Sequence, residues 1–240
     1  MSDHLQAISR DKHLRVIVGD ETSFRARTQP ADGKHGIEKV ERLPGNVGYI
    51  ELRGFHGTSP EASAAASAAM SSLADADVLI VDLRRNGGGS PHMVALITSY
   101  LFDAPVHLNS LYSRERDRTD DFWTTREVVG ERFGGNKPVF VLTSKRTFSG
   151  AEEFSYNLKA LKRATIVGET TGGGAHPGAL RRLNPRFAMF VPTGRAINPV
   201  TKTNWEGTGV APDVEVAADQ ALEKALELAG KPRREGATTS

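Results

Sequence analysis

The sequence contains no cysteine, and this absence excludes a disulfide-stapled scaffold, a zinc site built on thiolates and a cysteine nucleophile. It also lacks any apolar run near the ~18 residues that a membrane-spanning helix needs, so no membrane span is expected. The N-terminal segment MSDHLQAISRDKH has no apolar stretch typical of a signal peptide. The localisation is left open: the protein is cytoplasmic if Met1 is the native start, and exported if a preceding region with a signal has been removed.

An excess of charge of one sign is missing as well. Lysine and arginine number 31 and aspartate and glutamate 29, for a formal net charge of +2. This balance does not suggest a nucleic-acid-binding surface. The seven histidines show no H-E-x-x-H or comparable metal-binding spacing. We therefore expect no nucleic-acid partner, no metal and no cofactor.

The apolar residues that are present alternate between strand-like and helix-like stretches. Strands are predicted at residues 13–18, 47–52, 77–83, 138–143, 164–167 and 187–192, and helices at 59–73, 91–102, 149–163 and 217–229. The uninterrupted runs at 77–83 and 138–143 are typical of strands buried on both faces in a parallel sheet. A hydrophobic content of 38% over 240 residues is sufficient for one core. The pattern predicts one main α/β domain.

A glycine-rich segment, DLRRNGGG at 82–89, joins a predicted buried strand to a predicted helix. Such turns form the ligand-binding edge of an open parallel sheet, and the glycines leave backbone N–H groups accessible. A dinucleotide-binding G-x-G-x-x-G would need glycine where His92 stands, and no G-K-[ST] is present. The loop is therefore either a tight turn or a site for an oxyanion.

Ser149 lies in the segment TFSGAEEF, again after a predicted buried strand and at the start of a predicted helix. Together with Glu152 it forms the S-x-x-E pattern of a capping box, which many helices without a function have. The same position suits a nucleophile, because the helix N-terminus favours a developing negative charge. It is not a lipase-type G-x-S-x-G elbow, since Thr147 and Ala151 replace both glycines. On local pattern alone the cap is favoured.

Two further loops complete the candidates. The segment GETTGGGAH at 168–176 is another glycine-rich loop at a strand end, and NWEGTGVAPD at 204–213 places Trp205 beside Glu206 in a turn. A carboxylate there is either partly buried and functional or an ordinary surface acid.

Taken together, the ordered motifs V-D-L-R-x-N-G-G-G, T-S-x-x-T-F-S-G-A-E-E-F, V-G-E-T-T-G-G-G and N-W-E-G-x-G-V-x-P-D resemble the tail-specific (C-terminal processing) serine peptidases. The resemblance is strongest to the branch of interphotoreceptor retinoid-binding protein modules and tricorn-type proteases. It runs from about residue 11 to residue 229. It implies an α/β fold built as a crotonase-like spiral of β-β-α units and a serine hydrolase mechanism. The sequence departs from many processing peptidases in one respect, because we expect no PDZ domain here.

The resemblance also assigns roles to residues. Ser149 matches the nucleophile, and Gly174 stands where Ser–Lys peptidases have their lysine, so that dyad is absent. The segment DKHLR at 11–15 resembles the one that supplies a histidine base in the other branch, which makes His13 the candidate base, and Glu206 matches its acidic partner. Lys12 replaces a serine of the tricorn pattern.

The resemblance further assigns the oxyanion-hole amides. Gly150 and Gly88 match them, with Gly87 or Gly89 as alternatives to Gly88.

The expected organisation is a segment 1–45 that carries His13, a catalytic α/β domain at 46–230 and a disordered tail at 231–240. Family members usually have a helical region ahead of the DKHLR segment, and we expect that region to be missing here. Three residues, Phe122, Trp123 and Trp205, are candidates for lining a substrate groove, although core packing is favoured for each.

The function that this reading favours is a serine peptidase acting on peptides or unfolded chains, with its oligomeric state left open. One alternative is a non-catalytic module that binds a hydrophobic, retinoid-like ligand. Another is a crotonase-type acyl-transfer enzyme, which would not need a nucleophilic serine.

Overall fold

The computed structural model describes residues 1–19 and 33–230. Its helices are α1 (Ser2–Ser9), α3 (Pro60–Ser71), α4 (Pro91–Ser99), α5 (Gly150–Ala160) and α6 (Ala221–Ala229). Its strands are β1 (Arg15–Val18), β2 (Ile37–Leu43), β3 (Val47–Leu52), β4 (Val78–Asp82), β5 (His107–Ser113), β6 (Arg118–Trp123), β7 (Val139–Thr143), β8 (Thr165–Gly168), β9 (Gly178–Asn184), β10 (Phe187–Pro192), β11 (Gly194–Ile197) and β12 (Val214–Glu215).

A six-stranded sheet with the order β12-β8-β7-β4-β3-β2 forms the centre of the molecule. Its strands run parallel except β2, which pairs antiparallel with β3 at the edge. The two runs predicted to be buried on both faces form β4 and β7, which lie in the middle of the sheet and are buried throughout. The mixed α/β architecture expected from the sequence is therefore confirmed.

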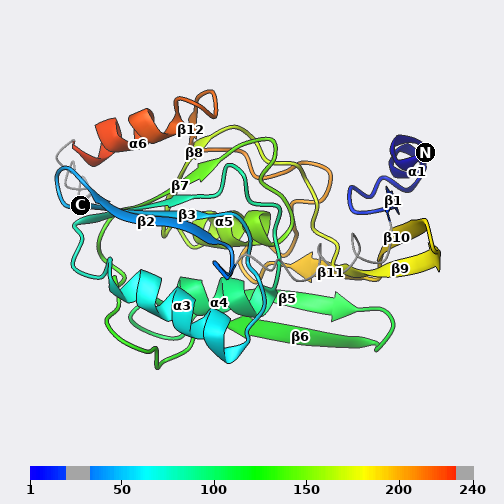
Figure 1. Ribbon diagram of the computed structural model, residues 1–240, viewed down its shortest axis with the longest axis horizontal. Helices are drawn as coiled ribbons and strands as arrows, with labels where there is room; N and C mark the ends of the chain where they lie inside the picture. The colour runs from blue at the N-terminus through cyan, green and yellow to red at the C-terminus, as the bar shows by residue number, and fades with distance from the viewer. Residues whose placement is uncertain (20–32, 231–240) are drawn as a thin grey trace, which may run out of the picture.

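Alternation along the buried strands divides the core into two layers. Leu79 and Val81 of β4 pack with α3, α4 and α5, whereas Val78 and Ile80 pack with α6 on the opposite face. Figure 1 shows α6 above the sheet and the other three helices below it. Because successive side chains of a strand point to opposite faces, an all-apolar strand such as β4 needs both covers.

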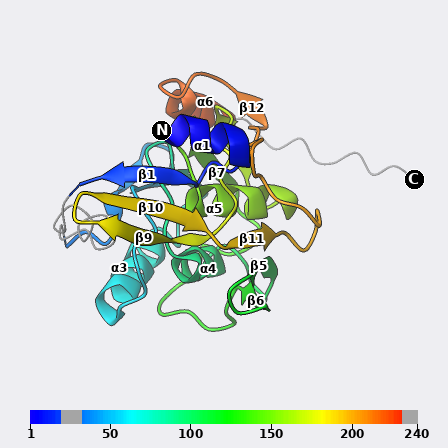
Figure 2. The same cartoon turned by 90° about the vertical axis from the view of Figure 1, so that its right-hand side faces the viewer.

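Two small sheets extend the molecule beyond the carboxyl ends of the central strands. One has the order β11-β5-β6 and the other β1-β10-β9. In the second, β1 pairs antiparallel with β10, with Arg15 opposite Phe190. Figure 2 shows β1 alongside β10 and β9 on one side of the domain, with α1 above them. This pairing holds the N-terminal segment against loops that lie more than a hundred residues away in sequence.

Two predicted elements begin two or more residues later than expected. The strand predicted from residue 13 begins at Arg15, because the backbone N–H of His13 donates to Asp11 Oδ1 at 2.9 Å instead of joining the sheet. The helix predicted from residue 217 begins at Ala221, because the preceding residues form a turn closed by Gln220 N–H and the carbonyl of Ala217 at 3.0 Å.

Several elements were not predicted: α1, β5, β6, β9, β11 and β12. The strand β2 falls within residues 19–45, a polar segment whose glycine and proline content predicts turns and short strands. The proposed division at residue 45 remains a prediction, and the tail expected to be disordered at 231–240 lies outside the described residues. In the described part of the chain, no helix is long and apolar enough to cross a membrane.

Candidate active site

Ser149 caps the N-terminus of α5, directly beyond the end of β7. Its backbone has φ 55° and ψ −119°, a region that residues with a side chain adopt only when the surroundings enforce it. The preceding turn supplies that enforcement: Thr147 Oγ1 donates to the carbonyl of Leu83 at 2.8 Å and accepts from Ser144 N–H at 2.9 Å. The capping box predicted with Glu152 is present. Ser149 therefore caps the helix while its side chain stays only half-buried.

His13 lies next to this serine, as the sequence predicted. Its Nε2 is 2.9 Å from Ser149 Oγ, across a sequence separation of 136 residues. The imidazole is buried between the rings of Phe148 and Phe190, with centroid distances of 4.7 and 5.3 Å. Burial lowers the pKa of His13 to about 4, against an opposing attraction from Asp11. The ring is therefore neutral at pH 7 and can accept a proton from the hydroxyl.

Gly174 accounts for the absence of a lysine in this site. A Cβ atom at that position would lie 2.7 Å from Cε1 of His13 and would also collide with the ring of Phe148. Position 174 is where Ser–Lys peptidases have their lysine, and here the imidazole of His13 and the ring of Phe148 fill the space beside it. A histidine from the N-terminal segment and a side chain at position 174 cannot both be accommodated in this arrangement.

Glu206 lies close to His13 but does not hydrogen bond to it in the described structure. Its Oε1 accepts from Lys12 N–H at 2.9 Å and its Oε2 from Ala175 N–H at 2.6 Å. It thereby joins the N-terminal segment to the 172–176 loop. The carboxylates of Asp11 and Glu206 and a ring nitrogen of His13 offer atoms that lie within 4.8 Å of one another. A cation there would compete with the hydrogen bonds that both carboxylates already accept.

A second histidine joins this cluster, and sequence reasoning missed it. His176 Nδ1 is 2.6 Å from Asp11 Oδ2 and 3.6 Å from Glu206 Oε2. The hydrogen bond with Asp11 raises the pKa of His176. Burial alone would raise the pKa of Asp11, but the hydrogen bonds from His176 and the His13 backbone outweigh it and lower that pKa. Asp11 opens the DKHLR segment, and His176 ends the GETTGGGAH loop just beyond the motif used for the resemblance, so only the fold shows that the two side chains meet.

The glycine-rich loop lies directly against the nucleophile. A Cβ atom on Gly88 would come within 2.7 Å of both Gly150 N and Ser149 Cβ. The N–H of Gly88 donates to Asn86 Oδ1 at 2.8 Å, so it is already engaged. Gly89 N lies near Gly150, 3.0 Å from where a Cβ on that glycine would stand. Of the two alternatives to Gly88, Gly89 is the one whose backbone nitrogen lies beside Gly150.

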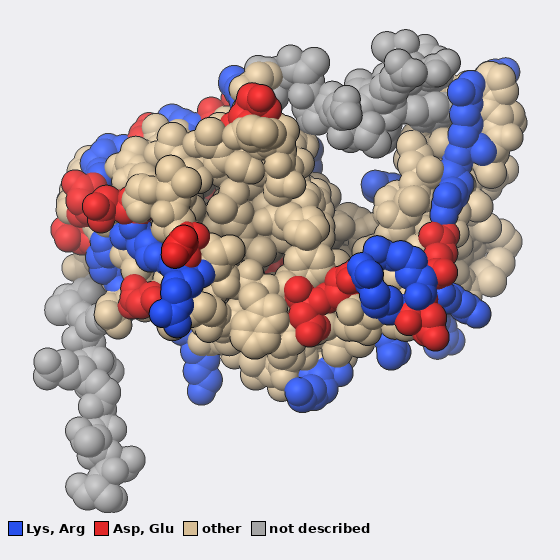
Figure 3. All heavy atoms as spheres, turned by 90° about the horizontal axis from the view of Figure 1, so that it is seen from below, with Lys and Arg blue, Asp and Glu red and all other residues tan. Residues whose placement is uncertain are grey.

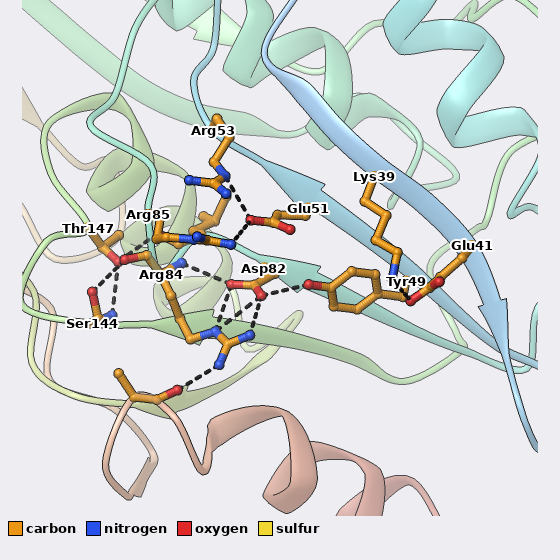
Figure 4. Close-up of polar contacts among 12 residues, drawn as sticks. Lys39, Glu41, Tyr49, Glu51, Arg53, Asp82, Arg84, Arg85, Ser144 and Thr147 are labelled. Carbon is orange, nitrogen blue, oxygen red and sulfur yellow. Dashed lines mark hydrogen bonds and ion pairs between the residues drawn. The ribbon is translucent and has the colours of Figure 1, made fainter. Parts of the chain in front are cut away.

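A buried ionic cluster holds the base of this loop. Asp82, at the end of β4, accepts from Tyr49 Oη at 2.7 Å and from the guanidinium of Arg84, as Figure 4 shows. Burial raises the pKa of Asp82, but hydrogen bonds from Arg84 and Tyr49 outweigh it and lower that pKa. Arg84 in turn donates to the carbonyl of Ala218 at 2.7 Å, and its own carbonyl accepts from Ser144 Oγ at 2.6 Å. The glycine loop and the serine turn are thus fixed to one another.

Glu152 connects the nucleophile turn to the 171–174 loop. Its carboxylate accepts four hydrogen bonds, from Ser149 N–H, Thr171 Oγ1, Gly173 N–H and Gly174 N–H, at 2.6–2.9 Å. Burial nevertheless raises its pKa. Because all four donors converge on one carboxylate, Glu152 has a structural role that the capping-box pattern revealed only in part.

A small cavity of about 70 Å³ opens beside Ser149 and is lined also by Glu153, Leu111, Ala196 and Trp205. Of the three aromatic candidates, Trp205 is buried and lines this cavity, with Nε1 donating to the carbonyl of Gly174 at 2.7 Å. Phe122 is buried too and lines the larger groove next to it. Core packing was wrong for Trp123, which is 50% exposed and stacks on His107.

Comparison with known proteins identifies what this arrangement resembles. The sequence model described as Peptidase family S41 matches residues 46–216. The chain is 31% identical over 210 residues to the chloroplastic carboxyl-terminal-processing peptidase 2 of Arabidopsis thaliana, covering 83% of this chain and 39% of that protein. It is 27% identical over 232 residues to the tricorn protease of Thermoplasma volcanium, covering 88% of this chain and 20% of that protein.

A solved structure shares the fold. The photosystem II D1 C-terminal processing protease superimposes with a TM-score of 0.58 at 22% identity, covering 92% of this chain and 53% of that one. The resemblance to tail-specific and tricorn-type peptidases read from the motifs is confirmed. The chain spans about two fifths of the length of the plant peptidase.

Proposed function

We propose that this chain, which belongs to peptidase family S41, hydrolyses peptide bonds through an acyl-enzyme on Ser149 with His13 as general base. The observation that carries the proposal is the 2.9 Å contact between His13 Nε2 and Ser149 Oγ. A serine hydroxyl is a weak nucleophile until a base within hydrogen-bond reach accepts its proton, and a neutral imidazole is such a base.

The reaction begins when Ser149 Oγ attacks the carbonyl carbon of the substrate while His13 Nε2 accepts the hydroxyl proton. The carbonyl oxygen becomes an oxyanion, for which the N–H groups of Gly150 and Gly89 are the donors that the geometry supports, with Gly88 engaged by Asn86. Each such donor contributes about 3 kcal/mol of transition-state stabilisation. His13 then returns its proton to the leaving amine, and water, activated by the same histidine, hydrolyses the ester.

The charge that forms on His13 during this reaction is stabilised by Asp11 and Glu206. Attraction from Asp11 already raises the pKa of His13 against the larger effect of burial. Glu206 fixes the backbone on either side of the imidazole through Lys12 and Ala175. In this proposal Glu206 is the acidic partner by position and field, without a direct hydrogen bond to the ring.

The substrates that we propose are peptides or unfolded protein chains, since relatives of this chain are named for carboxyl-terminal processing and tail-specific proteolysis. We also infer that the mixed sheet and its helices follow the crotonase-like spiral of β-β-α units. A serine with an enforced backbone conformation and a hydrogen-bonded histidine favours hydrolysis over the two alternatives, because neither ligand binding nor thioester chemistry requires that pair.

Labelling with a fluorophosphonate probe tests the proposal. The chain should be labelled, and Ser149→Ala and His13→Ala should abolish labelling while remaining folded. Ser113→Ala and His107→Ala are matched controls on β5 and should be labelled like the parent chain. A folded parent chain that does not react, or labelling that survives Ser149→Ala, would overturn the assignment.

A further inference from the structure

We propose that the cavity beside Ser149 is a specificity pocket for a lysine side chain of the substrate, and that Glu153 is the group that binds its ammonium. This inference rests on the proposed function, because it says which substrate side chain precedes the peptide bond that Ser149 would cleave. Glu153 belongs to the motif that carries Ser149, yet neither the capping box nor the mechanism uses it.

Glu153 is placed one helical turn after the nucleophile. Its backbone N–H donates to the carbonyl of Ser149 at 2.9 Å, and residues four apart in a helix lie on the same face. Side chains in a helix tilt toward its N-terminus, which directs Glu153 toward Ser149. Both residues line the same cavity. A substrate carbonyl held at Ser149 would therefore place its side chain within reach of this carboxyl group.

One oxygen of this carboxyl group lacks the hydrogen bond that its burial demands. Glu153 is 5% exposed, and within the described residues its Oε1 is buried without a hydrogen bond. Burial raises its pKa to about 7, and the neighbouring side chain of Asn109 offsets only part of this. The adjacent Glu152 is equally buried but accepts four hydrogen bonds. An unsatisfied buried acceptor is costly, so a donor from a ligand would relieve Glu153 as the protein relieves Glu152.

The other residues that line the cavity indicate which ligand group would donate a hydrogen bond to Glu153. Leu111, Ala196 and Trp205 are apolar and suit a hydrocarbon stem. At the 10–15 Å³ that one water-sized group occupies, a cavity of about 70 Å³ holds about five to seven such groups. The lysine side chain, four methylenes and one nitrogen, matches this size and ends in a cation. An apolar stem with a cationic end fits both the walls and the carboxyl group.

The acidic groups of the adjoining groove do not offer the same attraction. Figure 3 shows acidic and basic side chains side by side on the face that includes the β5–β6 hairpin. There Glu115 pairs with Arg181, and Asp120 pairs with Arg116 and Arg118 at 3.1 and 2.7 Å. The charges of Glu115 and Asp120 are compensated at the surface. Asp121, the third acid of the groove, accepts from Ser110 Oγ at 2.6 Å and is exposed to solvent. Glu153 is therefore the buried acid of the cavity beside Ser149.

Peptide substrates that differ only in the residue before the cleaved bond test the inference. Lysine and norleucine share a hydrocarbon stem and differ in the terminal ammonium. We expect kcat/KM to favour lysine over norleucine by about thirtyfold or more at pH 8, the size of effect typical of a buried charge pair. Equal or better cleavage after norleucine would overturn the inference.

Glu153→Gln removes the charge and keeps the shape. It should abolish the preference for lysine while leaving cleavage after norleucine within a few-fold of the parent chain. Glu115→Gln is the matched control in the groove and should keep the preference. A preference for lysine that persists in Glu153→Gln would place the selecting charge elsewhere and contradict the assignment.

The lysine-to-norleucine ratio should also fall between pH 8 and pH 6, as the Glu153 carboxylate gains a proton. A ratio cancels any titration that affects both substrates equally, including that of His13. Other titratable side chains on α5 and the elements packed against it have their own partners: Glu152 with four donors, Tyr156 with Thr201, Lys159 with Asp213, His92 with Phe122, His107 with Trp123 and Tyr112 with Asp117.

A binding measurement separates this inference from the proposed function. Ser149→Ala protein is titrated with product-like peptides that end in lysine or norleucine, and the double variant with Glu153→Gln serves as comparison. Tighter binding of the lysine peptide that requires Glu153 supports the pocket even if fluorophosphonate labelling were to fail. Labelling of the parent chain combined with equal binding of both peptides would reject the pocket and leave the hydrolase standing.

Discussion

Replacing His13 by phenylalanine should make the protein's stability less sensitive to acid. The imidazole is 4% exposed and packs between two aromatic rings, so a phenyl ring keeps the packing and removes the titration. Because burial lowers the pKa of His13 from 6.5 to about 4, the folded state binds fewer protons than the unfolded state between those values. Its contribution to stability is present above pH 6.5 and is lost as the pH falls toward 4.

The size of the effect follows from the two pKa values. The pKa of His13 is 6.5 in the unfolded chain and about 4 in the folded chain. This difference lowers the free energy of unfolding by about 2 kcal/mol between pH 7.5 and pH 5, and by about 3 kcal/mol by pH 4. Urea unfolding of the parent chain and of His13→Phe at pH 7.5, 6 and 5 measures it. Subtracting the free energies of unfolding of the two proteins at each pH removes the contribution of every titrating group that the substitution leaves unperturbed.

Two stability curves that run parallel from pH 7.5 to pH 5 would refute the reasoning. They would mean that His13 is solvated, or that its imidazolium is stabilised as well in the folded chain as in the unfolded one. The same burial predicts that fluorophosphonate labelling stays constant down to about pH 5 and declines only below it, because the base remains neutral there.

Three further predictions concern the geometry around the nucleophile. In urea unfolding, the free energy of unfolding of Ser149→Gly should exceed that of Ser149→Ala by about 1 kcal/mol, because glycine adopts the φ of 55° without strain. Equal free energies would show that the turn relaxes. Gly174→Ala should slow labelling about tenfold or more with a circular dichroism spectrum like the parent's, since its Cβ would lie 2.7 Å from His13 Cε1; unchanged labelling would contradict that contact. Glu206→Gln should cost about 1–2 kcal/mol in urea unfolding and slow labelling, because an amide cannot accept from both backbone N–H groups; a variant as stable and reactive as the parent would remove Glu206 from the site.

The sequence predicted the central strands and their helices because buried elements have a local pattern of apolar residues. The apolar runs that became β4 and β7 could be read directly from the sequence. The strands β5 and β9 lack such an apolar pattern, since their side chains are largely polar and partly exposed. Their formation depends on pairing with partners distant in sequence, which local pattern does not reveal.

The sequence by itself determined the family, through four motifs in a fixed order, and with it the serine, the histidine and the glycine loops to examine. Tertiary structure alone decided how they meet. The pairing of β1 with β10 brings His13 to Ser149, and a hydrogen bond to Asn86 Oδ1 engages the Gly88 amide that the resemblance assigned to the oxyanion hole. The Asp11–His176 pair and the unsatisfied Glu153 likewise arise from burial and proximity, which a chain of residues does not display until it is folded.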